Sequence, residues 1–134
     1  MDRKRFHIGE IGSEDEFKQW IKDMNVQSKV MVENVSLDEL KRGLAEGSIL
    51  LVDVREPNEY AAGRIPGAML HPLQRFDPQV LPREAGRRVV LSCRSGKRSL
   101  TALGLAQAAG REDVCAHFDG GMLAWVAAGE PVES

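Results

Sequence analysis

One stretch decides the fold we expect: Val89-Val90-Leu91-Ser92-Cys93-Arg94-Ser95-Gly96-Lys97-Arg98-Ser99. It starts with an apolar run typical of a buried strand, and apolar residues at helical spacing continue over residues 97–109. The intervening glycine predicts a sharp turn, because glycine adopts backbone angles that other residues avoid. We therefore expect Cys93 in a tight turn at the carboxyl end of a strand, where sites in parallel sheets usually lie.

Strand and helix patterns alternate through much of the chain. Residues 49–54 form a continuous apolar run, as in a strand buried on both faces. Ser36 and Glu39 have the spacing of a capping box and predict a helix that ends near Gly47. The remaining strand candidates are residues 30–35, 68–71, 89–92 and 114–118, and the remaining helix candidates are 58–62, 97–109 and a last helix after residue 120. This order predicts an α/β domain with a mainly parallel sheet and right-handed crossovers.

Length and composition limit the classes of protein to which this chain can belong. The 134 residues fit one domain with a real core, and the net charge of −2 gives no basic field for nucleic acid. No apolar run approaches the roughly 20 residues that span a bilayer, and no apolar signal region follows the charged start of the chain. Two cysteines without metal-ligand spacing suit a reducing cytoplasm and indicate no bound metal or cofactor.

Residues 1–29 are expected to form an extension that precedes a domain of residues 30–134. Within the extension, residues 13–24 have a helical pattern, with one apolar stripe formed by Phe17, Trp20, Ile21 and Met24. Two interpretations stay open for this stripe. It packs on the surface of the chain's own domain, or it contacts a partner or a second copy.

The turn after residue 92 combines the parts of a nucleophilic site. Cys93 is the candidate nucleophile, since nearby positive charge and a helix N-terminus both favour the reactive thiolate. Three cations follow within five residues, and backbone N–H groups of residues 94–98, including that of Ser95, are placed to hold an anion. Gly96 leaves room for a substrate near the backbone. The expected substrate-binding cations are Arg94, Lys97 and Arg98, with a solvated basic patch as the alternative.

Four further residues are candidate supports for this turn. Asp53 ends the buried strand, where its carboxylate would accept hydrogen bonds from loop N–H groups. Arg55 is expected to pair with Glu59 or to face the site, and Ser99 is expected to cap the following helix. The alternative is an ion-pair network that only shapes the fold. Outside this set, we expect Cys115 in the core, with a resolving thiol as the second interpretation, and we expect both His71 and His117 to be structural or exposed.

Three stretches together resemble the rhodanese-like family of sulfurtransferases. They are residues 51–68, with Asp53-Val54-Arg55 and Gly63-Arg64-Ile65-Pro66-Gly67; the Cys93 turn; and residues 119–132, with Asp119-Gly120-Gly121. The resemblance runs from about residue 30 to the end of the sequence and leaves out residues 1–29. It implies a five-stranded parallel sheet with helices on both faces and a persulfide on Cys93 during turnover. One departure is Arg64, where many relatives have histidine, and we assign Arg64 no catalytic role.

The function implied by the resemblance is thiosulfate sulfurtransfer. A small anionic donor, thiosulfate or another persulfide, would give sulfur to Cys93, and cyanide or a thiol would take it away. The alternatives are a sulfur carrier fed by a protein partner, with a protein as acceptor, or a domain that only docks a partner. A cysteine-dependent phosphatase is disfavoured, because that class has Cys, five residues and then Arg. Here Ser99 stands at that position and Arg98 comes one residue early.

Overall fold

The computed structural model describes residues 30–134, which form a five-stranded sheet in the order β1-β5-β4-β2-β3. The strands are β1 (Glu33–Asn34), β2 (Ile49–Asp53), β3 (Met69–Leu70), β4 (Arg88–Ser92) and β5 (Ala116–His117). Every pairing between these strands is parallel, which confirms the predicted sheet. The expected helix over residues 13–24 and its apolar stripe lie outside the described residues.

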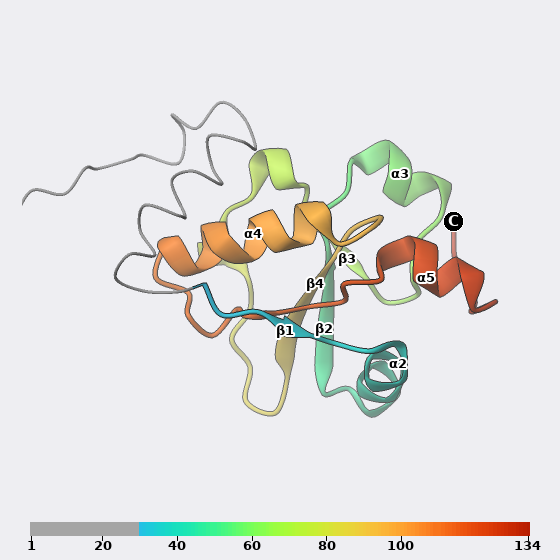
Figure 1. Ribbon diagram of the computed structural model, residues 1–134, viewed down its shortest axis with the longest axis horizontal. Coiled ribbons are helices and arrows are strands. Elements are labelled where there is room, and N and C mark those ends of the chain that lie inside the picture. Colours follow the sequence, from blue (N-terminus) through green and yellow to red (C-terminus); the bar gives the residue numbers. More distant parts are fainter. Residues whose placement is uncertain (1–29) are drawn as a thin grey trace, which may run out of the picture.

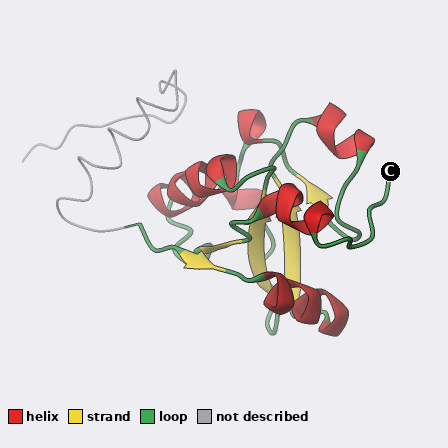
Figure 2. Ribbon diagram, turned by 45° about the vertical axis from the view of Figure 1, so that its right-hand side comes forward, coloured by secondary structure: helices red, strands yellow, loops and turns green. Residues whose placement is uncertain are grey.

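The helices lie on both faces of the sheet, and all but α5, which follows the last strand, stand between successive strands. They are α2 (Leu37–Glu46), α3 (Pro57–Ala62), α4 (Lys97–Ala108) and α5 (Gly121–Ala127), with short 3-10 helices η2 (Leu73–Arg75) and η3 (Pro78–Val80). Figure 1 shows α4 on one side of the β2–β4 pair, with α3 and α5 on the other. Figure 2 shows the strands in the middle of this arrangement. Helices on both faces are therefore confirmed.

Helix α2 begins and ends where the sequence predicts. The Ser36 side chain accepts the N–H of Glu39, and the Glu39 carboxylate accepts the N–H of Ser36. These two bonds satisfy N–H groups that have no partner inside the helix. The helix ends at Gly47, whose φ of 76° lies in the left-handed region that glycine enters without strain.

The central strands are buried on both faces, so their side chains pack into two hydrophobic cores, one on each face of the sheet. Ile49 and Leu51 of β2 pack into the core covered by α2 and α5, whereas Val52 packs into the core covered by α4. Strand β4 divides in the same way, with Val90 in the first core and Leu91 in the second. This alternation explains why both strands are continuous apolar runs in the sequence.

The register of the central strands sets the position of the site. Asp53 pairs with Ser92, so β2 and β4 end side by side, and the N–H of Val54 donates to the carbonyl of Ser92 over 2.9 Å. The segments after these two strands therefore leave the sheet together at its carboxyl edge, as expected for a parallel sheet. Between residues 30 and 134, no helix has the length and apolar character needed to cross a membrane.

Replacing Ser36 with alanine tests the cap of α2. Ser36→Ala removes the acceptor for the Glu39 N–H, and we expect the free energy of unfolding in urea to fall by about 1 kcal/mol. Ser36→Asp is the matched control, because aspartate caps helices as well as serine does. An equal loss in both variants would contradict the role of Ser36 as a cap.

Candidate active site

The Cys93 sulfur lies at the start of α4 and accepts backbone N–H groups from it. The thiol is 1% exposed, and Sγ lies 3.1 Å from the amide nitrogen of Gly96 and 3.4 Å from that of Ser99. Gly96 is the N-cap residue of α4 and has no side chain to cap the helix. The sulfur therefore fills the place of a capping atom. A negative charge there is stabilised by the N–H groups and by the helix dipole.

Two glycines allow the backbone to close around this sulfur. Gly96 has a φ of +92°, and a Cβ atom on it would lie 2.5 Å from the carbonyl oxygen of Asp119. Gly121 has a φ of +64°, and a Cβ atom there would collide with the backbone of Arg94 and Cys93. Only glycine meets both demands, because other residues avoid positive φ and need more space. Gly96 thus has its predicted role in the sharp turn, and Gly121 allows the backbone of α5 to lie against the same turn.

Helix α5 holds the Cys93 turn from the other side. The N–H of Met122 donates to the carbonyl of Cys93 over 2.9 Å, and the N–H of Leu123 donates to the carbonyl of Arg94 over 3.1 Å. These bonds turn the two carbonyls outward toward α5. The N–H groups of Gly96 and Ser99 remain directed at the sulfur.

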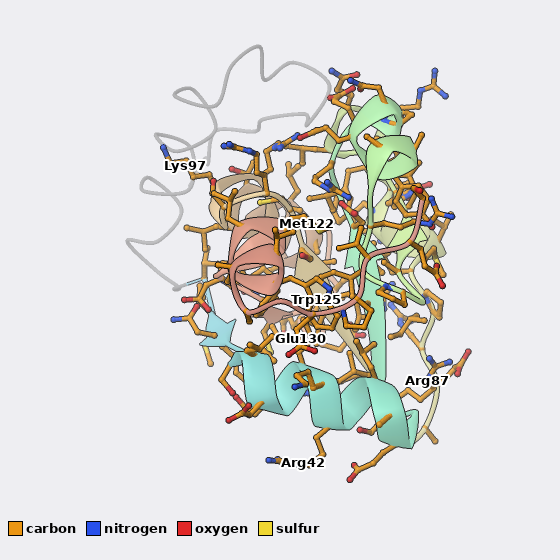
Figure 3. All side chains as sticks on the ribbon, turned by 90° about the vertical axis from the view of Figure 1, so that its right-hand side faces the viewer. Arg42, Arg87, Lys97, Met122, Trp125 and Glu130 are labelled. Carbon is orange, nitrogen blue, oxygen red and sulfur yellow. The ribbon has the colours of Figure 1, made fainter. Side chains whose placement is uncertain are left out.

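The three predicted cations occupy different surroundings. Arg98 is half-buried and makes two hydrogen bonds to the Glu59 carboxylate, at 2.7 and 3.0 Å. Arg94 and Lys97 are exposed, and in residues 30–134 neither forms an ion pair. Figure 3 shows Lys97 extending away from the ribbon. The turn therefore has one cation held by a carboxylate and two that face solvent, as Ser95 does.

The Glu59–Arg98 pair links α3 to α4 and changes the ionisation of both groups. The hydrogen bonds from Arg98 lower the pKa of Glu59 to about 2, and the bonds to Glu59 raise the pKa of Arg98. Arg98 also interacts electrostatically with Cys93. Glu59 thus fixes the position of a permanent positive charge near the sulfur.

Asp53 and Arg55 pair with each other at the end of β2. The guanidinium of Arg55 donates to both carboxylate oxygens of Asp53, with distances of 2.7 to 3.0 Å, and also to the carbonyl of Gly63. Both residues are buried, at 4% and 5% exposure. The structure thus differs from the expected Arg55–Glu59 pair, because Arg98 occupies the Glu59 carboxylate. Asp53 accepts the N–H of Arg55, and this closes the bend after β2.

A buried hydrogen-bond chain leads from Cys93 into the sheet. Cys93 Sγ lies 3.6 Å from Ser99 Oγ, Ser99 Oγ lies 2.8 Å from His117 Nδ1, and His117 Nε2 lies 3.0 Å from Asn34 Oδ1. Ser99 and His117 are 0% and 3% exposed. No local pattern in the sequence points to His117, because its link to the turn depends on β5 lying next to β4. Burial lowers the pKa of His117, while Asp119 acts in the opposite direction.

Other candidates from the sequence lie away from the sulfur. Cys115 is half-buried rather than fully in the core. His71 accepts the N–H of Asp77, and its ring lies tilted against that of Phe76, with 5.3 Å between the centroids. Arg64 lies over the ring of Tyr60, with 4.6 Å between the guanidinium carbon and the ring centroid.

The chain matches a known family model over most of its length. The model describes the rhodanese-like domain and covers residues 36–128. An uncharacterised protein of Synechocystis is 38% identical over 107 residues, which is 80% of this chain. The chain spans 58% of the length of that relative and 42% of a mycobacterial transcriptional regulator of the helix-turn-helix type.

Several relatives of similar size bear the name sulfurtransferase. A sulfurtransferase of Allochromatium vinosum is 35% identical, with 76% of this chain and 95% of the relative covered. A human thiosulfate:glutathione sulfurtransferase is 38% identical, with 57% and 78% covered. The solved structure of a human single-domain sulfurtransferase is 32% identical with a TM-score of 0.60, and 70% of this chain and 95% of that chain are covered.

Gly96→Ala tests whether the glycine turn shapes the thiol site. Gly110 has a similar φ of +94°, but a Cβ atom on it would have nothing within 4 Å, so Gly110→Ala is the matched control. We expect both variants to lose about 1–2 kcal/mol from left-handed backbone strain, and Gly96→Ala to lose about 1–3 kcal/mol more from crowding. The free energy of unfolding in urea measures this difference.

Alkylation of Cys93 by iodoacetamide, followed by peptide mass spectrometry, gives the second readout of these variants. We expect Gly96→Ala to slow alkylation about tenfold, because the Gly96 N–H leaves the sulfur. Gly110→Ala should react as the wild type does. Equal stability and equal alkylation in the two variants would show that the turn tolerates a Cβ atom.

Glu59→Gln tests the ion pair through its pH dependence. Because the pKa of Glu59 falls from 4.5 to about 2 on folding, the pair stabilises the folded state above pH 4.5 and loses this effect toward pH 2. We expect Glu59→Gln to cost about 1 kcal/mol at pH 7 and progressively less as the pH falls. Urea unfolding across this range measures the change.

Glu84→Gln is the control for this pH series, since Glu84 forms a more exposed pair with Arg87. Its effect should be smaller at every pH. A cost of Glu59→Gln that stays constant from pH 7 to pH 2 would contradict the assignment of the ion pair.

Proposed function

The chain belongs to the rhodanese-like domain family, and on this basis we propose that it is a sulfurtransferase that carries sulfur as a persulfide on Cys93. One observation supports this most directly. The Cys93 sulfur lies at the N-terminus of α4 and accepts two backbone N–H groups, an arrangement that stabilises a thiolate. Relatives that this chain covers almost end to end bear the name sulfurtransferase.

We propose thiosulfate as the donor in the first half-reaction. The Cys93 thiolate attacks the outer sulfur of thiosulfate and forms a new S–S bond. The bond between the two donor sulfurs breaks, and sulfite leaves with its electron pair. The products are sulfite and a Cys93 persulfide anion, so the total charge is unchanged. This covalent intermediate divides one difficult transfer into two easier steps.

An acceptor nucleophile removes the sulfur in the second half-reaction. Cyanide or the thiolate of a small thiol attacks the outer sulfur of the persulfide, the S–S bond breaks, and Cys93 leaves as the thiolate. The products are thiocyanate or a new small-molecule persulfide. A small thiol is supported by the human relative named for thiosulfate and glutathione. A protein thiol reacting by the same step would make the chain a carrier for a partner.

The residues of the turn have distinct roles in this scheme. The N–H groups of Gly96 and Ser99 stabilise the thiolate and the negative charge on the persulfide. Arg94 and Lys97 face solvent at the turn, where they would attract the anionic donor and the leaving sulfite. Arg98, held by Glu59, adds a fixed positive charge. Asp53 and Arg55 act indirectly, because they hold the bend beside the turn.

The positions of the cations disfavour phosphate chemistry. A phosphatase of the cysteine-dependent class uses its loop arginine to bind the phosphoryl oxygens. The loop arginine of this chain, Arg98, is occupied by a bidentate carboxylate. Cys93 is buried, which suits a donor that presents a single atom to its sulfur.

Thiocyanate release from thiosulfate and cyanide tests the proposed function. We expect turnover by the wild type and by Cys115→Ser, and none by Cys93→Ser, because only Cys93 lies among the N–H groups at the start of α4. Circular dichroism confirms that each variant is folded. Equal turnover in Cys93→Ser and wild type would overturn the assignment of the nucleophile. A folded wild type without turnover would exclude thiosulfate as donor.

A further inference from the structure

Cys93 is buried, so its proton needs a route out when the thiolate forms. The thiol is 1% exposed, and the side chain nearest to its sulfur as a hydrogen-bond partner is Ser99, at 3.6 Å. Ser99 is itself 0% exposed and bonds His117 Nδ1 at 2.8 Å. These contacts form a continuous path from the sulfur to an imidazole that the proposed reaction does not use.

The contacts of His117 define which of its nitrogens accepts a proton. Nε2 lies 3.0 Å from Asn34 Oδ1, and an amide oxygen only accepts hydrogen bonds. Nε2 therefore carries the hydrogen in the neutral ring, and Nδ1 presents its lone pair to Ser99. The Ser99 hydroxyl then donates to Nδ1 and accepts the S–H of Cys93. Each hydrogen bond along this series of side chains is therefore donated in the direction that leads away from the Cys93 sulfur.

We propose that Ser99 and His117 form a relay that accepts the Cys93 proton, which makes His117 a positioning residue for the nucleophile. The Cys93 S–H bond breaks as Ser99 Oγ takes that proton, and the hydroxyl proton of Ser99 passes to Nδ1. A thiolate and an imidazolium result, and the total charge of the group is unchanged. No electrons are transferred, and no other reactant is needed. The inference rests on the proposed function, since it takes Cys93 as the reacting thiol.

The surrounding charges are consistent with this transfer. Burial lowers the pKa of His117 and so disfavours the charged ring, whereas Asp119 acts in the opposite direction. Once the thiolate forms, the opposite charges on Cys93 and His117 stabilise each other in buried surroundings. Charged groups act on the pair from several elements: Asp119 after β5 acts on His117, and Arg98 of α4, held by Glu59 of α3, acts on Cys93. Arg94 and Lys97 are exposed at the turn, and Asp53 and Arg55 pair with each other after β2.

The pH profile of Cys93 alkylation in a Cys115→Ser background tests the relay. His117→Asn keeps an oxygen that accepts from Ser99 but has no group that takes up a proton. We expect alkylation by iodoacetamide at pH 7 to slow about tenfold, with half-maximal reactivity moved up by about one pH unit. Ser99→Ala should shift the profile in the same direction. His71→Asn is the matched control, because the His71 ring accepts the Asp77 N–H and contacts the Phe76 ring, and its replacement should leave the profile unchanged.

Nitrogen NMR of the His117 ring in the unaltered sequence gives a test that does not depend on the folding of any variant. We expect Nδ1 to keep its proton at pH values at which Cys93 is already reactive and to lose it only at higher pH. Once Cys93 is alkylated, the ring should lose that proton at a lower pH. A ring whose Nδ1 carries no proton at any pH at which Cys93 is reactive would overturn the proposal, as would an unshifted profile in folded His117→Asn. Neither measurement uses a sulfur donor, so a failure of sulfurtransfer would appear separately.

Discussion

The site depends on one interaction, in which the sulfur of Cys93 replaces the side chain that would normally cap α4. Gly96 offers no capping atom, so the N–H groups of Gly96 and Ser99 turn to the sulfur. A thiol is a weak acceptor and a thiolate a strong one. The cap is therefore stronger when Cys93 is ionised. The same two hydrogen bonds stabilise the folded turn and favour the reactive thiolate.

The surrounding elements supply what this interaction needs. The register of β2 and β4 places the bend after Asp53 beside the turn. Backbone N–H groups of α5 donate hydrogen bonds to the carbonyls of Cys93 and Arg94. Carboxylates hold two arginines in place around the turn, since Glu59 pairs with Arg98 and Asp53 with Arg55. Arg98 is thereby fixed as a positive charge near the sulfur, and Arg94 and Lys97 are exposed at the turn.

Much of the fold followed from local patterns in the sequence. The capping box of Ser36 and Glu39, the apolar run of β2 and the glycine of the Cys93 turn act within a few residues, so a single sequence predicts them. The contacts between side chains that are distant in the sequence could not be predicted from such local patterns. Arg98 meets Glu59 across 39 positions in the chain, and Ser99 meets His117 across 18. Such contacts depend on strand order and register, which local patterns do not define.

The mass of the Cys93 peptide after incubation with thiosulfate is the decisive measurement for the persulfide mechanism, because it detects the sulfur itself and needs no acceptor. We predict a gain of about 32 Da, the mass of one sulfur atom, on Cys93 and its reversal by cyanide. A polysulfide donor, used in parallel, separates the choice of donor from the chemistry of the thiol. A folded protein whose Cys93 gains no sulfur from either donor would contradict the persulfide mechanism.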